Sequence, residues 1–421
     1  MSADARSLEQ WLGHIAQLHP AAIELGLERV GQVWSRMAMP KRCPVIIVGG
    51  TNGKGSTCAM LEAVLLAAGY RVGTYSSPHL LRYNERVRIN GREAPDAQLA
   101  AGFAAVERVR GDTSLTYFEY ATLAAWASFA VAGLDVLVLE VGLGGRLDAV
   151  NVFDPDLSIV TSVALDHTDL LGDSREQIGW EKAHIFRSGR PAICADPDPP
   201  ASLVRYAQSI GADLRLAGRD FGFDGDQQQW RFRGRTWQRG GLAYPALRGA
   251  NQLLNASAAL AALEALSERL PVSAGAIREG FANVTLTGRF QALPGKPLVI
   301  LDVAHNPHAA AVLATNLASM ERFARTIAVF GMLRDKDVAG VIGRMHDQID
   351  VWHVATTPGP RGSTAAALMY LLDQRGAEAY PHEDLPGAWR AAREAAGEAD
   401  RIVVFGSFLT VSAVLESLGS V

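Results

Sequence analysis

The chain has 421 residues, of which 48% are hydrophobic and 20% are charged, and its net charge is −4 at neutral pH. This length and apolar content can bury at least one large core, and two domains are expected. The small negative charge excludes a general attraction to nucleic acid or to anionic membranes. No uninterrupted apolar stretch reaches about eighteen residues, the length that a membrane-spanning helix needs.

The N-terminal segment predicts a helix and contains no apolar signal core. Ser7 is followed three residues later by Gln10, which is the spacing of a capping box at the start of a helix. The three cysteines, Cys43, Cys58 and Cys194, form no C-x-x-C pair and have no metal-like spacing. Unpaired cysteines of this kind are typical of small buried hydrophobes in a reducing compartment. We therefore expect a cytoplasmic protein.

The next segment combines a short apolar strand, a glycine-rich loop and a helix. The strand is Val45–Val48, the loop is Gly49–Ser56, and an apolar pattern at helical spacing follows over Ser56–Ala68. Glycines let backbone N–H groups point inward, a lysine can reach the outer phosphates, and a serine hydroxyl can bind Mg²⁺. The order strand, loop, helix favours a site for ATP or a close relative over a turn that is merely rich in glycine.

Apolar runs alternate with helical segments along the whole chain, which is typical of a doubly wound parallel sheet. Between the two halves, Asp220–Tyr244 predicts a small β-meander near 220–244, and Asn251–Phe281 predicts helices. A threonine and glycine cluster at Thr285–Gly288 marks the expected boundary between domains 1–287 and 288–421. The clearest further strands are Leu134–Val141, Leu157–Val163, Leu298–Val303, Thr326–Phe330, Val351–Ala355 and Arg401–Phe405.

Ligands of open α/β sheets bind beyond the carboxyl ends of the strands, so polar residues at these ends are candidate contacts. Glu140 ends one apolar run, where a carboxylate commonly holds Mg²⁺ on a nucleotide. A capping or ion-paired carboxylate is the alternative for Glu140. Asp166, His167 and Asp169 follow the next run, and there both a metal site and ordinary hydrogen bonding are open.

Other strand ends also carry polar groups, each of them a weak indication by itself. The loop at 75–86 has the composition of a solvated turn, and residues 301–307 and 405–408 place polar or glycine residues just after apolar runs. Their coincidence predicts a composite active site between two domains, one of which supplies nucleotide contacts while the other closes over it.

Six motifs, read together in their order along the chain, resemble the folylpolyglutamate synthase/dihydrofolate synthase family, a branch of the Mur ligase superfamily. The motifs are Gly50–Ser56, Ser76–Leu80, Glu140–Asp148, Leu165–Thr168, Thr287–Phe290 and Asp302–Pro307. The resemblance extends from about Trp11 to about Thr410. It implies an α/β fold with a P-loop-containing, doubly wound, mostly parallel sheet of the Mur ligase central-domain type, plus a smaller C-terminal Rossmann-like α/β domain.

The glycine-rich loop departs from the usual G-x-x-x-x-G-K-[ST] spacing in a way that supports this resemblance. Val48 occupies the position of the first glycine, and Gly55 separates Lys54 from Ser56. The shifted loop is itself a trait of the superfamily.

The resemblance implies an ATP-dependent carboxylate–amine ligase of folate biosynthesis. The carboxylate of dihydropteroate, or of tetrahydrofolate and folylpolyglutamates, attacks the γ-phosphate of ATP, and the amine of L-glutamate then displaces phosphate from the acyl phosphate. Cations must offset the charge between this carboxylate and ATP. ATP and two Mg²⁺ ions are the implied cofactors, and the partners are small-molecule substrates of a monomer, without nucleic acid or membrane.

The resemblance also implies roles for individual residues. The catalytic residues are Lys54, Lys182 and His305. The ATP contacts are Thr51, Asn52, Gly53, Lys54, Gly55, Ser56, Asn255, Arg289 and Asp302. The metal positions are Ser56, Ser77, Glu140, His167 and, if it is carbamylated, Lys182. The dihydropteroate contacts are Ile23, Glu24, Leu25, Gly26, Thr116, Tyr117, Phe118, Glu119, Leu147, Asp148 and Ala149.

For Lys182, the aromatic pair and the glutamate contacts, physical arguments or other interpretations apply. An unmodified Lys182 would repel Mg²⁺, and without the resemblance an ordinary surface lysine would be the better interpretation. Tyr117 and Phe118 can stack on a flat pterin ring, although aromatic residues at this spacing are more often part of a core. Glutamate is expected nearer the second domain, where His305 and Ser407 are candidates.

Other classes of protein remain as alternatives. A monofunctional folylpolyglutamate synthase would lack the dihydropteroate reaction. A Mur-type ligase for a UDP-linked precursor is disfavoured, because about 45 residues precede the loop strand and a separate sugar-nucleotide domain needs roughly 100. A GTPase switch should carry N-K-x-D, but Arg334–Asp337 lacks the asparagine. A scaffold without chemistry is disfavoured by Lys54, Glu140, His167 and Lys182.

Overall fold

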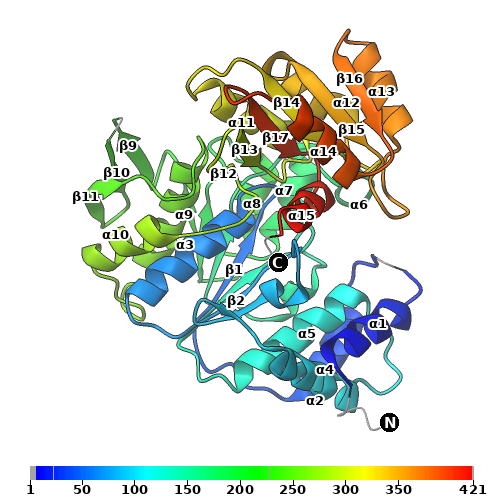
Figure 1. Cartoon of the computed structure of the whole chain (residues 1–421). Helices are drawn as coiled ribbons and strands as arrows, with labels where there is room; N and C mark the ends of the chain where they lie inside the picture. The colour runs from blue at the N-terminus through cyan, green and yellow to red at the C-terminus, as the bar shows by residue number, and fades with distance from the viewer. Residues whose placement is uncertain (1–5, 22, 227, 420–421) are drawn as a thin grey trace. The chain divides into compact units, whose positions relative to one another are not determined.

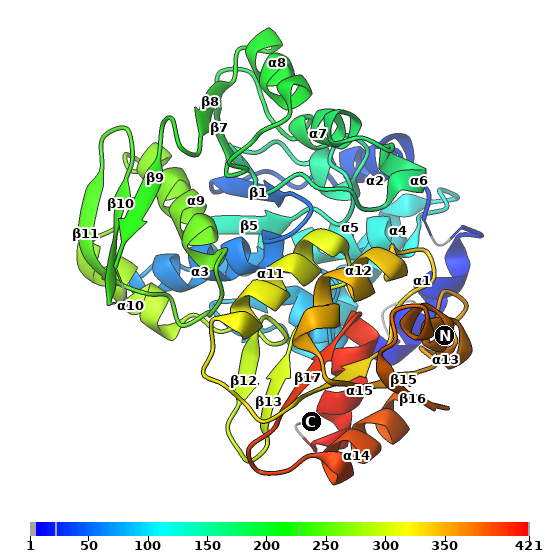
Figure 2. The ribbon, with the colours of Figure 1, turned by 90° about the horizontal axis from the view of Figure 1, so that it is seen from above.

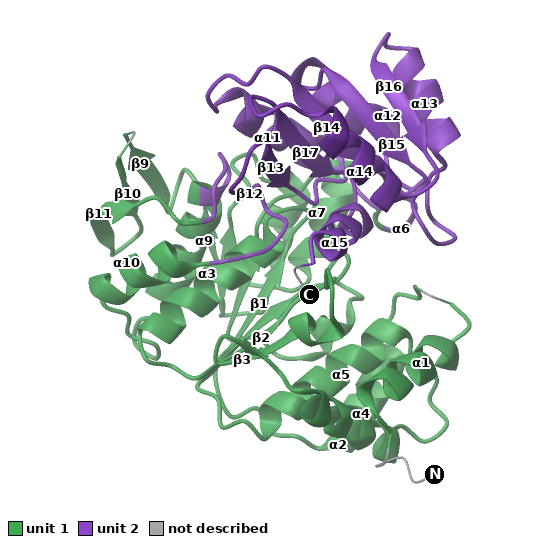
Figure 3. Ribbon diagram, viewed as in Figure 1, with its two compact units in different colours: residues 1–164, 171–246, 253–284 green, residues 165–170, 247–252, 285–421 purple. Residues whose placement is uncertain are grey.

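The computed structural model describes residues 6–21, 23–226 and 228–419, which fall into two compact units. Unit 1 comprises residues 1–164, 171–246 and 253–284, and unit 2 comprises residues 165–170, 247–252 and 285–421 (Figure 3). Two short segments of the first two thirds of the chain, 165–170 and 247–252, therefore belong to unit 2. The predicted division into domains at 287/288 stays a prediction.

Unit 1 is built on an eight-stranded sheet in the order β4-β3-β2-β5-β1-β6-β7-β8. At its centre, β1 (Val45–Gly49) pairs in parallel with β5 (Val136–Glu140) and β6 (Leu157–Val160). All residues of these three strands are buried, because helices cover both faces, and this explains their largely apolar sequences. The other strands are β2 (Val72–Tyr75), β3 (Val87–Ile89), β4 (Arg92–Glu93), β7 (Pro191–Cys194) and β8 (Asp213–Leu216).

The helices of unit 1 form two layers around this sheet. Figure 1 and Figure 2 show α3 (Lys54–Ala67), α9 (Gln252–Ala265) and α10 (Ala274–Asn283) side by side. On the opposite face lie α4 (Asp96–Arg110) and α5 (Tyr117–Ala130), and the two pack closely on each other. The remaining helices of unit 1 are α1 (Leu8–Leu18), α2 (Glu28–Met37), η2 (Tyr83–Arg86), η3 (Ala149–Val152), α7 (Arg175–Ala183) and α8 (Ala201–Ser209). The short helix α6 (Thr168–Leu171) lies mostly in segment 165–170 of unit 2.

The predicted capping box at the start of α1 is confirmed. The Ser7 hydroxyl accepts the Gln10 backbone N–H at 3.2 Å, and the Gln10 side-chain oxygen accepts the Ser7 N–H at 2.9 Å. Two N–H groups that the helix itself leaves without acceptors are thereby satisfied.

A small antiparallel sheet of β9 (Gly222–Gly225), β10 (Gln229–Arg233) and β11 (Gln238–Ala243) lies within segment 220–244. The buried carboxylate of Glu264 on α9 accepts the backbone N–H groups of Thr236 and Trp237, both at 2.6 Å. A Cβ on Gly234 would lie 2.5 Å from a Glu264 oxygen, so only glycine lets the turn approach this closely. One carboxylate thus fastens the β10–β11 turn to α9.

Unit 2 contains a six-stranded sheet in the order β12-β13-β17-β14-β15-β16, in which only β12 runs antiparallel to its neighbour. Its buried core includes Ile300, Phe330, Trp352 and Phe405 of the sheet, which pack against apolar residues of α11, α12 and α13. The strands are β12 (Gln291–Leu293), β13 (Leu298–Leu301), β14 (Thr326–Phe330), β15 (Val351–Ala355), β16 (Glu378–His382) and β17 (Arg401–Phe405). The helices are α11 (Pro307–Ala318), α12 (Val338–Met345), η4 (His346–Gln348), α13 (Ala365–Asp373), α14 (Leu385–Ala395) and α15 (Phe408–Ser417).

The expected α/β class, with a larger P-loop-type sheet and a smaller parallel sheet, is therefore confirmed. The predicted bounds of β14, β15 and β17 are those of the structure. In the part of the chain that the structure describes, no helix is both long and apolar enough to cross a membrane.

Asp156, just before β6, holds the amino ends of β1 and β6 together. Its carboxylate accepts the Val45 N–H at 2.8 Å and forms ion pairs of 2.6 Å with both Lys41 and Arg269. Burial opposes ionisation and is the largest influence on its pKa. The hydrogen bonds from Lys41, Arg269 and Val45 outweigh burial, so the pKa of Asp156 lies below its usual value.

We expect Asp156→Asn to lower the free energy of unfolding by roughly 3 kcal/mol at pH 7, because it leaves three cations, Lys41, Arg190 and Arg269, without their buried partner. Because the pKa of Asp156 is lower in the folded protein than in the unfolded chain, its ionised form stabilises the folded protein at pH values above the ordinary pKa near 4. This stabilisation is lost as the pH falls through the pKa of the folded state. The difference between wild type and variant in urea unfolding should therefore shrink below pH 4. Asp154→Asn is the matched control, because Asp154 is 66% exposed and should change stability by less than about 0.5 kcal/mol. An equal effect of both variants would contradict the role of Asp156.

Candidate functional site

The glycine-rich loop lies between β1 and α3, and its shape is held by the chain that follows β6. The N–H of Thr51 donates to the Ser162 carbonyl at 2.8 Å, and the N–H of Asn52 donates to the Ser162 hydroxyl at 3.0 Å. The Thr161 hydroxyl donates to the Asn52 carbonyl at 2.7 Å. Since these two N–H groups brace the loop, the donors suited to a phosphate are those of the first turn of α3, which have no acceptor within the helix.

Two glycines of this loop are required by its geometry. Gly50 and Gly53 have φ values of +144° and +88°, a region that side chains disfavour. A Cβ on Gly50 would lie 1.9 Å from the Thr161 hydroxyl oxygen, and one on Gly53 would lie 2.6 Å from the amide oxygen of Asn255. Asn255, a predicted ATP contact on α9, is therefore adjacent to the loop.

Lys54, the first residue of α3, crosses the loop. Its Nζ donates to the carbonyl oxygens of Gly50 at 3.1 Å and Thr51 at 3.2 Å. The ammonium thus lies over the concave backbone that a polyphosphate would enter, where the N-terminus of α3 also favours negative charge. Ser56, also in the first turn of α3, is 2% exposed.

Glu140 lies at the carboxyl edge of the sheet, next to this loop. It is paired in register with Val48 of β1, two residues before Gly50, and it is 4% exposed. The Ser77 N–H, which follows β2, donates to the Glu140 carboxylate at 3.2 Å. The structure therefore brings together Glu140 and Ser77, two of the predicted metal positions.

Lys182 is buried, with 3% of its surface exposed, so the alternative of an ordinary surface lysine is wrong. It lies near the C-terminal end of α7, where the loop after Glu140 contacts the helix. A Cβ on Gly145 would lie 3.0 Å from the Lys182 Cα, and the Arg146 N–H donates to the Glu181 carbonyl at 2.9 Å. The Arg146 guanidinium also pairs with the Glu181 carboxylate at 3.0 Å. These contacts hold the helix end that carries Lys182.

The three segments predicted to line the dihydropteroate site lie close together in unit 1. The Gly26 N–H donates to the Leu147 carbonyl at 3.2 Å, which joins the first segment to the third. Asp148 accepts the N–H groups of Leu143 at 2.8 Å and Val150 at 3.0 Å. Burial raises the pKa of Asp148 to about 6, against the effect of these bonds.

Arg29 joins the first of these segments to the second. Its guanidinium donates to the Glu119 carboxylate at 3.1 Å and pairs with the Glu24 carboxylate. Glu119 also accepts the Thr116 N–H at 2.8 Å, as the third helical residue of a capping box that opens α5. Because Glu119 is 3% exposed and bonded in this way, its visible role is to shape the segment. Its contact with a substrate stays a prediction.

Tyr117 and Phe118, the predicted stacking pair, point to different neighbours. Tyr117 lies against Tyr83, with ring centroids 6.4 Å apart, and beneath the Arg86 guanidinium at 5.6 Å. The Phe118 ring lies so close to Gly142 that a Cβ there would be 2.5 Å from the ring. Glycine at 142 therefore lets the loop after Glu140 pass over this ring.

Unit 2 carries the remaining predicted residues. The Asp302 carboxylate accepts the N–H groups of Phe290 at 2.9 Å and Ala304 at 2.8 Å. It thereby joins two motifs that are distant in sequence. Arg289 lies over the Phe408 ring at 5.1 Å, and burial raises the pKa of Asp302 despite this nearby guanidinium. Ser407 is 3% exposed and caps α15 through the Thr410 N–H at 3.1 Å.

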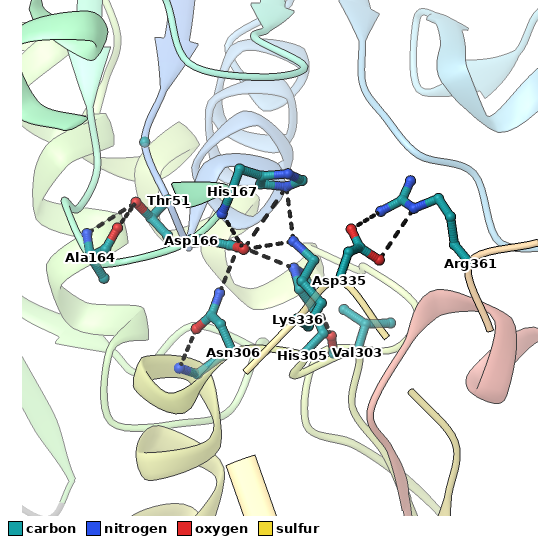
Figure 4. Close-up of polar contacts among 12 residues, drawn as sticks. Thr51, Ala164, Asp166, His167, Val303, His305, Asn306, Asp335, Lys336 and Arg361 are labelled. Atoms are coloured by element: carbon teal, nitrogen blue, oxygen red, sulfur yellow. Dashed lines mark hydrogen bonds and ion pairs between the residues drawn. The ribbon is translucent and has the colours of Figure 1, made fainter. Parts of the chain in front are cut away.

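Four polar residues of unit 2 meet at Asp166 (Figure 4). One Asp166 oxygen pairs with Lys336 Nζ at 2.6 Å and accepts the His167 backbone N–H at 2.9 Å. The other oxygen accepts the Asn306 amide at 3.1 Å and faces His305 Nε2 at 3.6 Å. Lys336 Nζ also lies 2.9 Å from His167 Nε2.

Electrostatics favours the ionised form of Asp166. Burial is the largest influence and opposes ionisation, but the hydrogen bond from His305 and the charge of Lys336 lower its pKa well below the usual value. The His305 Nδ1 lies 2.8 Å from the Val303 carbonyl, which keeps the other ring nitrogen toward Asp166. The interpretation of Asp166 as an ordinary hydrogen-bonding residue therefore describes its contacts here. Asp169 lies in the first turn of α6 and is exposed.

The donor set fits a divalent cation with oxygen ligands. Glu140 supplies a buried carboxylate beside Ser77, and Ser56 supplies a hydroxyl at the start of α3. Over the described ranges no group of three or more His, Cys, Asp or Glu residues is positioned to hold a metal by itself. The predicted positions contain only two residues of these kinds, Glu140 and His167, so a bound phosphate or a carbamate would have to complete the ligands.

Two residues that shape these sites, Lys336 and Arg29, were not among the predicted site residues. The capping role of Thr116 and Glu119, which were predicted as substrate contacts, was also missed. Lys336 follows the end of β14, so the rule on strand ends that singled out Glu140 could have found it. Thr116 and Glu119 match the capping-box pattern that was recognised at Ser7. Arg29 gave no local indication of its bond to Glu119, because the two residues lie 90 positions apart.

Comparisons with known proteins identify the family of this chain. Residues 48–263 match the Mur ligase middle domain, and residues 288–408 match the Mur ligase glutamate ligase domain. The chain is 47% identical over 413 residues to the dihydrofolate synthase/folylpolyglutamate synthase of Escherichia coli K12, covering 98% of this chain and 96% of that protein.

Solved structures give the same result. The structure of E. coli FolC in complex with DHPP and ADP matches with a TM-score of 0.95 and 46% identity, covering 99% of both chains. A bifunctional folylpolyglutamate synthase/dihydrofolate synthase with Mn, AMPPNP and L-glutamate bound matches with a TM-score of 0.92 and 47% identity, again over 99% of both chains. The chain belongs to the dihydrofolate synthase/folylpolyglutamate synthase family of Mur ligases.

Proposed function

We propose that this chain joins L-glutamate to 7,8-dihydropteroate, giving dihydrofolate, and to tetrahydrofolate and folylpolyglutamates, at the expense of ATP. The relatives bind ADP or AMPPNP, Mn, DHPP and L-glutamate, which are ligands of the kinds that this reaction requires. The observation that carries the proposal is the loop between β1 and α3, which Lys54 crosses. Glu140 lies beside this loop, because it is paired with Val48, two residues before Gly50.

The residues present suit an anionic nucleotide and its metal. The first turn of α3 and Lys54 bind and orient the phosphates, and Asn255 lies beside the loop at Gly53. Glu140, Ser77 and Ser56 hold Mg²⁺, which when bound offsets the negative charge of the phosphates during attack by the substrate carboxylate. Arg289 and Asp302 are proposed as further contacts to ATP.

Lys182 is proposed to carry a carbamate. Its burial removes it from bulk water, where an ammonium is best solvated, and an ammonium near Mg²⁺ would repel the metal. Reaction of the neutral amine with CO₂ forms an N–C bond and releases a proton, which converts the group into an anion with oxygen ligands. Such ligands are the kind that Mg²⁺ prefers.

The proposed substrate segments lie together in unit 1. Residues 23–26, 116–119 and 147–149 are joined by Arg29 and by the bond from Gly26 to Leu147, which supports a shared role in binding dihydropteroate. We also propose that His305 and Ser407 contact glutamate and that the chain forms domains 1–287 and 288–421. We further propose that the protein is a monomer located in the cytoplasm. The free state of all three cysteines and the net charge of −4 support this location.

Product analysis with separate acceptors tests the function. We expect phosphate release to depend on glutamate, with dihydropteroate converted to dihydrofolate and tetrahydrofolate extended by glutamate. Extension of tetrahydrofolate alone would indicate the monofunctional synthase. Equal ATP turnover with and without both acceptor and glutamate would contradict a ligase.

A further inference from the structure

Lys336 contacts both Asp166 and His167, which are adjacent in the sequence, and it has no role in the proposed ligation. It lies in the loop between β14 and α12, and its side chain is 5% exposed. Its Nζ is 2.6 Å from an Asp166 oxygen and 2.9 Å from His167 Nε2 (Figure 4). A buried ammonium is thus placed directly on one nitrogen of a proposed metal ligand.

The chemistry of this contact limits what His167 can do. The Lys336 ammonium has three donors and no acceptor, so Nε2 of the His167 imidazole must be the acceptor of the hydrogen bond between them. A neutral imidazole that accepts at Nε2 carries its proton on Nδ1. A metal ion needs the lone pair of a ring nitrogen. While Lys336 holds this contact, one lone pair of His167 is occupied and the other nitrogen carries a proton.

The backbone on both sides of the contact is fixed. His167 has a φ of +52° and is held by the bond from its N–H to the Asp166 side chain. Asp335 pairs with Arg361 at 2.6 Å, and Asp337 caps α12 through the Gly340 N–H at 2.8 Å. Since both neighbours of Lys336 are anchored, its side chain is the part that can leave His167 without moving the loop.

We propose that Lys336 is a positioning residue that takes the place of a divalent cation at Asp166 and His167, and that it must leave His167 before His167 can coordinate metal. The ammonium neutralises Asp166 and orients the imidazole, so the segment 165–170 stays ordered without metal. Binding of the metal then replaces one cation with another. This inference rests on the proposed function and on the prediction that His167 is one of its metal ligands.

Titration of the full-length protein with Mn²⁺ alone, followed by electron paramagnetic resonance of the free ion, tests the proposal. We expect Lys336→Met to bind Mn²⁺ about tenfold more tightly than wild type, because a competing donor and a like charge are both removed. Lys336→Arg keeps the charge and should show no gain. Lys296→Met is the matched control, because Lys296 is 76% exposed and should leave the affinity unchanged.

The variant His167→Ala tests whether His167 binds metal at all, separately from whether Lys336 competes with the metal. We expect it to weaken Mn²⁺ binding in wild type and to abolish the gain in a double variant with Lys336→Met. If His167→Ala weakens binding but Lys336→Met leaves it unchanged or weaker, Lys336 does not compete with metal and the proposal is overturned. If His167→Ala has no effect, His167 is not a ligand and both ideas fail. Lys336→Gln replaces the methionine variant if that variant does not fold.

Discussion

Replacing Lys54 with methionine is expected to lower kcat/KM for glutamate ligation by a factor of about 1,000 while the fold remains intact. The Lys54 ammonium lies 3.1 Å and 3.2 Å from two carbonyl oxygens of the loop, over the site proposed for the phosphates. In the reaction, an anionic carboxylate approaches an anionic phosphate, so a fixed cation stabilises the transition state more than the separated reactants. Removal of one such group commonly costs a factor of 100 to 1,000.

Steady-state kinetics with ATP, glutamate and each acceptor measure this effect. Methionine keeps the length and the apolar stem of lysine, so thermal unfolding should change by only a few degrees. Lys296→Met, at an exposed position, should retain full activity. A Lys54→Met enzyme with activity within tenfold of wild type would show that the loop does not hold the transferred phosphate.

Lys182→Met is expected to lower turnover by a factor of about 100 or more, because the variant lacks the group that would form the carbamate. Lys182 is 3% exposed, and Gly145 and Arg146 hold the end of α7 that carries it. Lys182→Arg provides the sharper test. It keeps a positive charge but cannot be carbamylated, so it should be as inactive as the methionine variant if the carbamate is the working group.

Labelling with ¹³C-bicarbonate gives a readout that does not depend on activity. We expect a carbamate resonance in the wild-type protein and in Lys296→Met, and its absence in both Lys182 variants. Full activity of Lys182→Arg would instead assign the role to the positive charge. An active wild-type enzyme without the resonance in the presence of bicarbonate would refute the carbamate.

The predicted strands were most accurate where a strand is buried on both faces. Thr326–Phe330, Val351–Ala355 and Arg401–Phe405 are mainly apolar and buried along their whole length in a mostly parallel sheet, and their predicted bounds are those of the structure. The run Leu157–Val163 was predicted too long. Its ladder ends at Val160, because Thr161 and Ser162 leave the sheet to bond the loop after β1.

Short or polar edge strands escaped prediction. β3, β4, β12 and β16 pair with a neighbour through backbone bonds, and their sequences carry no long apolar run. In β16, the sequence of Glu378–His382 alternates polar and small residues and includes a proline, which by itself argues against a strand. Only the exposed edge of β15 makes this segment a strand.

The sequence by itself determined the class of the fold, the phosphate loop and the strand-end position of Glu140. These features depend only on residues that are close together in the sequence. A glycine, a lysine or a carboxylate that follows an apolar run in the chain also lies at the end of a strand in the fold. Only the tertiary structure decided that Lys182 is buried, that Arg29 joins Glu24 to Glu119, and that Lys336 reaches His167. The bond from Arg29 to Glu119 spans 90 residues and the contact of Lys336 with His167 spans 169, and no local pattern indicates which distant side chain will meet a buried one.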